Sequence, residues 1–203
     1  NMLFEKKKML SASNKFIQDI HDLPIEIKRS SIILIGPMGT GKSTIARILA
    51  KEGNRIPLDD TEFLKGLYAH QQEFHNYKNF EFGLVGTVLS TLKKTSVIDF
   101  GAGHSVYRNE KLRKKMQLMC AEFSNIILLL PSANKEESRQ ILLERRNIKP
   151  GSHKDQDNWH FITAPDNYEL ATHIIYENGK TPKDVAEEIE SLLRNKDNME
   201  EER

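Results

Sequence analysis

Residues 32–44 read Ile-Ile-Leu-Ile-Gly-Pro-Met-Gly-Thr-Gly-Lys-Ser-Thr and constrain the fold more than any other stretch of the chain. The stretch fills every fixed place of the phosphate-binding pattern G-x-x-x-x-G-K-[ST], with Gly36, Gly41, Lys42 and Ser43. The apolar run before the loop predicts a buried strand, and the residues after it predict a helix. Such a loop presents backbone N–H groups and the positive end of the helix to an anion. The stretch therefore predicts a site for a nucleoside triphosphate.

Within this loop, individual residues have different expected roles. Lys42 is expected to reach the β- and γ-phosphates, and the Ser43 hydroxyl is expected to ligate Mg²⁺. Contacts to the nucleotide are expected from the loop and the first helical turn, at Gly36, Met38, Gly39, Thr40, Gly41, Lys42, Ser43 and Thr44. Residues 134–137, Asn-Lys-Glu-Glu, have Glu where the guanine-reading pattern N-K-x-D needs Asp. ATP is therefore the expected nucleotide.

The composition limits the kind of protein. A chain of 203 residues suits one α/β domain with a sizeable core, and a formal net charge of +1 gives no general attraction to nucleic acid. The single cysteine, Cys120, excludes an internal disulfide and is expected to be a small buried residue on a helix. The longest apolar run, residues 126–130, is too short to span a bilayer, and no signal-peptide pattern is visible. These features predict a cytoplasmic protein, a monomer or weak dimer, with no nucleic-acid or membrane partner.

Apolar runs alternate with helical patterns along the chain. Strands are expected at residues 31–35, 55–58, 96–100, 125–130 and 173–176, with helices between them. The last helix is marked by Thr181 and Asp184, which fit a capping box. This alternation predicts an α/β fold with a five-stranded parallel sheet and helices on both faces. Ligands of such sheets bind beyond the carboxyl ends of the strands, so side chains that follow the strands are the candidate site residues.

Two terminal segments flank the predicted core domain, which spans residues 31–195. Residues 196–203 are expected to be a polar, frayed tail. Residues 1–30 form an extension that is expected to be helical and packed on the outside of the fold, with a partner-binding helix as the alternative. The helix is indicated by a cap at Ser13 followed by apolar residues at helical spacing, Phe16, Ile17, Ile20 and Leu23.

Three carboxylates follow predicted strands. Asp59 and Asp60 come after the second strand, where one can hold Mg²⁺ through water and the other can accept a proton from a substrate hydroxyl. Capping of the next helix explains the same two residues equally well. Asp99 ends the third strand, where a Walker-B-type carboxylate would lie. We expect Asp59 to assist the metal, and Asp60 or Asp99 to position or deprotonate the acceptor.

A glycine-rich turn and an arginine-rich segment follow the third and fourth strands. Gly101 and Gly103 allow a ligand to approach the backbone closely, and His104 could bind substrate or act as a base, with a solvated histidine as the alternative. Further on, a lid at about residues 147–160 would exclude water and bring an arginine onto the transferred group. Arg145 and Arg146 are both candidates, because a shift of one residue changes which side chain faces inward.

These residues resemble the shikimate kinase-like group of P-loop small-molecule kinases over about residues 31–193. Residues 35–44 are close to the first motif of that family, and 58–61, Leu-Asp-Asp-Thr, occupy the place of its Asp-x-Asp segment. Residues 77–81, Tyr-Lys-Asn-Phe-Glu, stand where the family has Phe-Arg-x-x-Glu, and residues 101–103 stand for its three glycines. The resemblance implies a three-layer P-loop NTPase fold like that of nucleoside-monophosphate kinases, ATP, Mg²⁺, and transfer of the γ-phosphoryl group to a hydroxyl.

The chain departs from this family on the acceptor side. Thr61 stands where the second Asp holds the substrate hydroxyl, and Lys78 replaces the arginine that grips the substrate carboxylate. Lysine is a point charge, so bidentate recognition is lost. The expected substrate-binding residues are therefore Thr61, Lys78, Gly101, Ala102, Gly103 and His104, for a small hydroxyl compound other than shikimate. A nucleotide-dependent regulatory or binding ATPase module is the alternative.

Overall fold

The computed structural model describes the backbone of residues 2–58 and 77–201 and the side chains from residue 12 onward within these ranges. The sites predicted at Asp59, Asp60 and Thr61 lie outside the described residues.

Five strands form one sheet in which each neighbouring pair is parallel, in the spatial order β2-β3-β1-β4-β5. Their bounds are β1 (Ile32–Ile35), β2 (Asn54–Pro57), β3 (Ser96–Asp99), β4 (Ile126–Leu130) and β5 (His173–Tyr176). The five predicted strands are confirmed, because each observed strand begins and ends within one residue of its prediction. The central strands β1 and β4 are buried along their whole length, as expected for continuous apolar runs covered on both faces.

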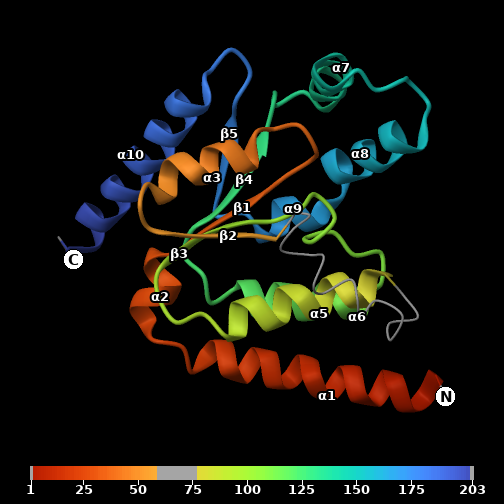
Figure 1. The fold of residues 1–203 in the computed structure, drawn as a ribbon, viewed down its shortest axis with the longest axis vertical. Coiled ribbons are helices and arrows are strands. Elements are labelled where there is room, and N and C mark those ends of the chain that lie inside the picture. Colours follow the sequence, from red (N-terminus) through yellow and green to blue (C-terminus); the bar gives the residue numbers. More distant parts are fainter. Residues whose placement is uncertain (1, 59–76, 202–203) are drawn as a thin grey trace.

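One face of the sheet is covered by α3 (Lys42–Ala50) and α10 (Pro182–Glu201), as Figure 1 shows. The core on this side joins strand residues to helix residues, among them Leu34, Ile127, Leu129, Ile45, Leu49, Val185 and Ile189. The capping box predicted for α10 is present, because Thr181 N donates to Asp184 Oδ2 at 2.9 Å and Asp184 N donates to Thr181 Oγ1 at 3.1 Å. The helix continues through Glu201, so most of the expected polar tail is helical.

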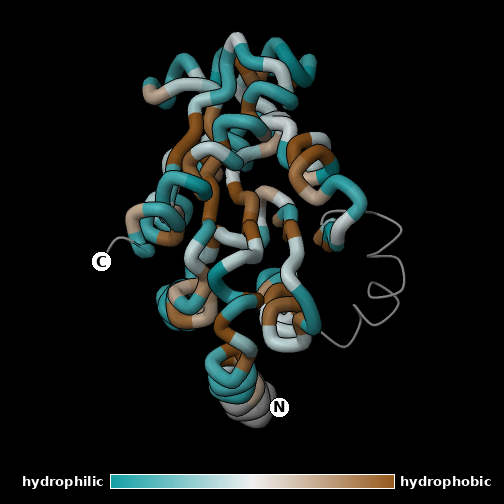
Figure 2. The backbone as a smooth tube through the Cα atoms, turned by 90° about the vertical axis from the view of Figure 1, so that its left-hand side faces the viewer, coloured by the Kyte–Doolittle hydropathy of each residue, from teal (hydrophilic) through white to brown (hydrophobic). Residues whose placement is uncertain are grey.

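The opposite face carries the larger core and more helices (Figure 1). These are α5 (Tyr77–Ser90), α6 (Glu110–Cys120) and the short α9 (Pro165–Leu170), while α7 (Lys135–Arg146) and α8 (His153–Thr163) lie beside the carboxyl edge of the sheet. Cys120 is buried at the end of α6, as expected, and burial raises the pKa of its thiol to about 12. Figure 2 shows the hydrophobic segments gathered in the middle of the molecule. Within the described ranges, no helix has both the length and the apolar character needed to cross a bilayer.

The N-terminal extension forms α1 (Met2–His21) and α2 (Ile25–Ser30), and α1 packs outside α5 and α6. The prediction that Ser13 caps this helix is wrong, because the helix begins at Met2 and includes upstream residues of high helix propensity. The Phe16 ring occupies the space above Gly86 of α5, where an added Cβ would lie 2.3 Å from Phe16 Cδ2. In the part of α1 whose side chains are described, Phe16, Ile17 and Ile20 therefore pack against this chain's own core.

Candidate active site

The loop between β1 and α3 has a backbone that favours glycine at two close approaches. Gly36 has a φ of +138°, and an added Cβ would lie 2.4 Å from the Leu129 carbonyl oxygen of β4. Gly39 has a φ of +90°, and its Cβ would lie 2.6 Å from Arg146 Cδ. A side chain at either position would be strained and would clash. These glycines hold the loop against β4 and α7.

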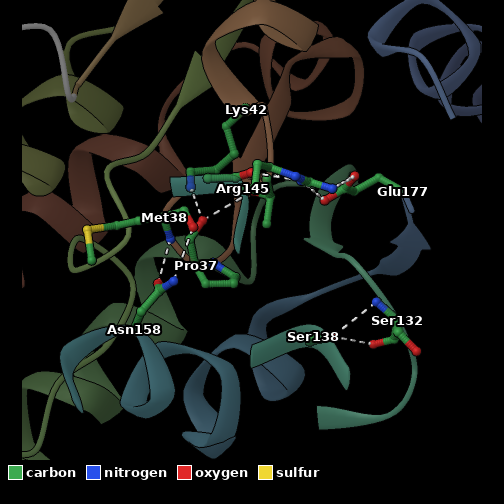
Figure 3. A network of polar contacts seen from close by, with 10 residues as sticks. Pro37, Met38, Lys42, Ser132, Ser138, Arg145, Asn158 and Glu177 are labelled. Carbon is green, nitrogen blue, oxygen red and sulfur yellow. Dashed lines mark hydrogen bonds and ion pairs between the residues drawn. The ribbon is translucent and has the colours of Figure 1, made fainter. Parts of the chain in front are cut away.

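The end of this loop has the features of an anion site. Gly41 is the N-cap of α3 with a φ of 83°, and no side chain in the described part of the protein caps the helix. Among the described residues, the N–H groups of the first turn therefore have no side-chain cap, as expected of a helix that binds phosphate. Lys42 is 7% exposed, and its Nζ donates to the carbonyls of Gly36 and Pro37, at 2.8 Å each (Figure 3). Backbone and lysine thus fit a polyphosphate.

The two arginines at the end of α7 have different environments. Arg145 Nη1 lies 2.6 Å from Glu177 Oε1 and also donates to the Gly39 carbonyl at 2.8 Å (Figure 3). Arg146 lays its aliphatic chain across Gly39 and is exposed, and within the described ranges it makes no ion pair. Arg145 therefore stabilises the loop, while the Arg146 guanidinium is not paired with a carboxylate of the described residues.

A residue that sequence reasoning missed contacts the same loop from α8. Asn158 accepts a hydrogen bond from Met38 N at 2.7 Å and donates one to the Met38 carbonyl at 3.1 Å (Figure 3). No sequence signal could have identified Asn158, because a single asparagine in a helix forms no motif. It lies inside the predicted lid segment, whose second half is the start of α8.

Asp99 lies at the end of β3 but is not open to an acceptor. Its two carboxylate oxygens accept from Arg55 Nε at 3.0 Å and from Arg55 Nη2 at 2.8 Å, and the residue is only 1% exposed. Such a bidentate pair fixes the carboxylate on the neighbouring strand β2. The expectation that Asp99 positions or deprotonates the acceptor does not fit this arrangement, and Arg55 is the partner that the sequence did not reveal.

The turn after β3 brings together several predicted substrate residues. It lies beside the phosphate loop, because β3 pairs with β1 and Phe100 N donates to the Leu34 carbonyl at 3.0 Å. Lys78 Nζ donates to the Gly103 carbonyl at 2.7 Å, forms an ion pair with Glu81 at 2.6 Å and lies 5.2 Å from the centre of the Tyr107 ring. The turn and the start of α5 therefore form one polar surface.

His104 is a buried part of this turn rather than a solvated histidine. Its Nδ1 accepts from Gly101 N at 2.7 Å, so the neutral ring carries its proton on Nε2. Burial, with smaller contributions from the positive charges of Lys78 and Lys42, lowers the pKa of His104 to about 3. The imidazole is therefore neutral near pH 7 and can offer a donor, not a basic Nδ1, toward the site.

Acid is expected to destabilise the protein through His104. The pKa is about 3 in the folded state and about 6.5 in the unfolded state, so only the unfolded chain gains this proton between those values. The free energy of unfolding should fall with decreasing pH by up to about 1.4 kcal/mol per pH unit from this group. The free energy of unfolding is measured by urea unfolding at pH 7 and at pH 5. We expect it to fall less between these two pH values in His104→Gln than in the wild type. Equal slopes for the two proteins would contradict the assignment.

Two further groups near this turn were not found from the sequence. Burial and then the charge of Arg108 lower the pKa of His160 on α8, with a smaller lowering from Lys78, while Asp166 and Asp157 act in the opposite direction. The turn itself is fastened to α9, because Tyr107 N donates to Asp166 at 2.9 Å and Ser105 Oγ donates to Asn167 at 2.5 Å. These contacts fix the turn against α9, beside the phosphate loop.

A magnesium site receives one candidate ligand from the described residues. Ser43 lies in the first turn of α3, directly after Lys42, and its hydroxyl is a suitable ligand. Among the described side chains, in residues 12–58 and 77–201, no three His, Cys, Asp or Glu side chains gather as a metal cage. The other predicted ligand, Asp59, lies outside these ranges.

Comparisons with known proteins show the fold. No family model matches the sequence, and a comparison with curated proteins gives no significant match. The structure is similar to shikimate kinase from Acinetobacter baumannii in complex with shikimate, with a TM-score of 0.61 and 19% identity over 85% of this chain and 98% of that one. It is also similar to a gluconokinase from Sinorhizobium meliloti 1021, with a TM-score of 0.52 and 13% identity over 82% and 92% of the two chains. The chain therefore has the three-layer P-loop NTPase fold found in these small-molecule kinases, as the resemblance predicted.

Proposed function

We propose that the protein is an ATP-dependent phosphotransferase that moves the γ-phosphoryl group to a hydroxyl of a small metabolite. One observation carries the proposal: the α3 N-terminus, which has no side-chain cap among the described residues, lies with Lys42 beside the turn after the neighbouring strand β3, where Lys78 is held by the Gly103 carbonyl. The α3 N-terminus with Lys42 suits a triphosphate, and the turn after β3 suits an acceptor. Both lie at the carboxyl edge of the sheet, where α/β folds bind ligands.

In this proposal the chain acts mainly by positioning and electrostatics. The loop amides and Lys42 hold the phosphates, and Ser43 ligates Mg²⁺, which offsets phosphate charge when bound. Arg146 is the better candidate to reach the transferred group, since Arg145 is engaged by Glu177 and the loop. Asp59 remains the proposed metal-side carboxylate, and Asp60 is the proposed proton acceptor because Asp99 is held by Arg55.

The acceptor in this proposal carries an anionic group in addition to its hydroxyl. Lys78 Nζ is held at the turn by the Gly103 carbonyl, and the positive charges of Lys78 and Lys42 both lower the pKa of His104, which supports two cations near an acceptor. Selectivity for shikimate is not expected, because Lys78, which stands where the family that the sequence resembles has an arginine, cannot form a bidentate contact. The proposed substrate class is therefore small hydroxy compounds with a carboxylate or phosphate.

A metabolite screen tests the proposal. Purified protein with magnesium and ATP is incubated with single hydroxy acids, sugar phosphates and uncharged polyols, and ADP release is followed. We expect strong stimulation by at least one anionic compound and none by its uncharged counterpart. Slow hydrolysis that no compound stimulates would contradict the kinase proposal and favour a nucleotide-dependent regulatory module.

A further inference from the structure

We propose that Asn158 of α8 is a positioning residue for the phosphate-binding loop, so that α8 sets the affinity of the nucleotide site. The inference rests on the proposed function to the extent that the loop binds a nucleotide. It concerns residues that neither the loop pattern nor the fold assigns to any role.

The contact is specific because it is reciprocal. Asn158 Oδ1 accepts from Met38 N at 2.7 Å while its Nδ2 donates to the Met38 carbonyl at 3.1 Å. One side chain thus fixes the two peptide groups on either side of Met38, between Gly36 and Gly39, two of the three loop glycines with positive φ. Asn158 is 4% exposed, so water cannot readily replace these bonds.

The helix that carries Asn158 is itself rigidly placed. Arg139 of α7 forms two hydrogen bonds with Asp155, at 2.9 Å and 2.7 Å, and its guanidinium lies 5.6 Å from the centre of the Trp159 ring. Asp155 also accepts from Gly151 N at 2.7 Å. Asn158 therefore occupies a position that α7 and α8 define together, rather than one on a loose lid.

The same pair of helices holds the next part of the loop. Arg145, at the end of α7, donates to the Gly39 carbonyl at 2.8 Å, so contacts from α7 and α8 reach successive loop residues (Figure 3). A loop held from outside has its amides arranged before the ligand arrives, and such preorganisation raises affinity. Removing the Asn158 amide would leave both Met38 backbone groups without their partner and release the loop.

The matched control is another buried asparagine that binds backbone elsewhere. Asn125 is 5% exposed, and its Nδ2 donates to the carbonyl of Arg29 at 2.6 Å. It lies just before β4, at the amino edge of the sheet and therefore at the end opposite the phosphate loop. Replacing it removes a comparable buried amide and should lower stability without touching the nucleotide site.

Calorimetric titration with magnesium-ADP tests the inference on the whole chain. We expect Asn158→Leu to raise Kd about tenfold (~1.4 kcal/mol) relative to the wild type. Asn125→Leu should leave Kd unchanged despite a lower Tm. Asn158→Asp, which keeps an acceptor for Met38 N but cannot donate to its carbonyl, should also raise Kd and provides the test if the leucine variant does not fold.

Two results would overturn the inference alone. One is an unchanged Kd in a folded Asn158 variant, and the other is an equal rise in Kd for the Asn125 variant. If the folded wild-type protein itself does not bind magnesium-ADP, the proposed function fails, and the role of Asn158 fails with it. The tenfold rise confined to Asn158 variants is the supporting result.

Discussion

Lys42→Ala is expected to lower the rate of ATP-dependent phosphoryl transfer by about 10²–10³-fold, the range observed when an enzyme loses one preorganised charge-stabilising group. The reason is the position of the Lys42 side chain, buried across the loop with Nζ 2.8 Å from two loop carbonyls. The measurement is the initial rate of ADP release with an acceptor found in the metabolite screen. Circular dichroism and Tm establish that the variant is folded.

An exposed lysine near the end of the same helix provides the control. Lys51 follows α3, and its Nζ lies 3.2 Å from Glu190 on α10. Lys51→Ala removes the same charge from the same side of the sheet, yet it should leave the rate unchanged. Turnover by Lys42→Ala within twofold of the wild type would remove Lys42 from the mechanism.

Arg55→Leu is expected to lower the free energy of unfolding by about 3–5 kcal/mol, because it leaves the Asp99 carboxylate buried without its partner. Asp99 is 1% exposed, and its two hydrogen bonds to Arg55 are 3.0 Å and 2.8 Å long. Urea unfolding at pH 7 measures the effect. The double variant Arg55→Leu/Asp99→Leu should recover much of the loss, since no unpaired charge remains.

Comparison with an exposed ion pair shows how much of the expected stability loss is due to burial of the charge. Breaking the Lys51–Glu190 pair with Lys51→Ala should cost no more than about 1 kcal/mol. The rate of ADP release by Asp99→Asn then distinguishes a structural partner of Arg55 from a general base, because loss of a general base lowers rates by about 10²–10⁴-fold. A rate loss of that size, or an Arg55→Leu variant as stable as the wild type, would contradict a structural role for this pair.

The sequence predicted the sheet well because its signals are local. Each strand is a short apolar run next to turn residues, and the phosphate loop is a contiguous pattern between a strand and a helix. The parallel arrangement followed from the alternation of strands and helices, which leaves few topologies. The error at Ser13 is also local. Serine is a good capping residue, but helix-forming residues precede it, and the helix begins at Met2.

The site was less predictable because its contacts join distant parts of the chain. Asn158 and Met38 are 120 residues apart, and Arg55 and Asp99 are 44 apart. The choice between Arg145 and Arg146 depends on how α7 is rotated against the loop, which sequence spacing leaves open by one position. His104 was predicted to line the site, but its protonation state depends on burial and on Lys78 and Lys42 from other elements.

Titration calorimetry with magnesium-ATP measures most directly whether residues 36–43 form a nucleotide site. The folded wild-type protein is expected to bind at one site, with a Kd between about 1 µM and 1 mM, and Lys42→Ala is expected to bind much more weakly. Absence of binding heat from folded wild-type protein, at several temperatures and at millimolar nucleotide, would contradict the proposed nucleotide site and every role assigned around it.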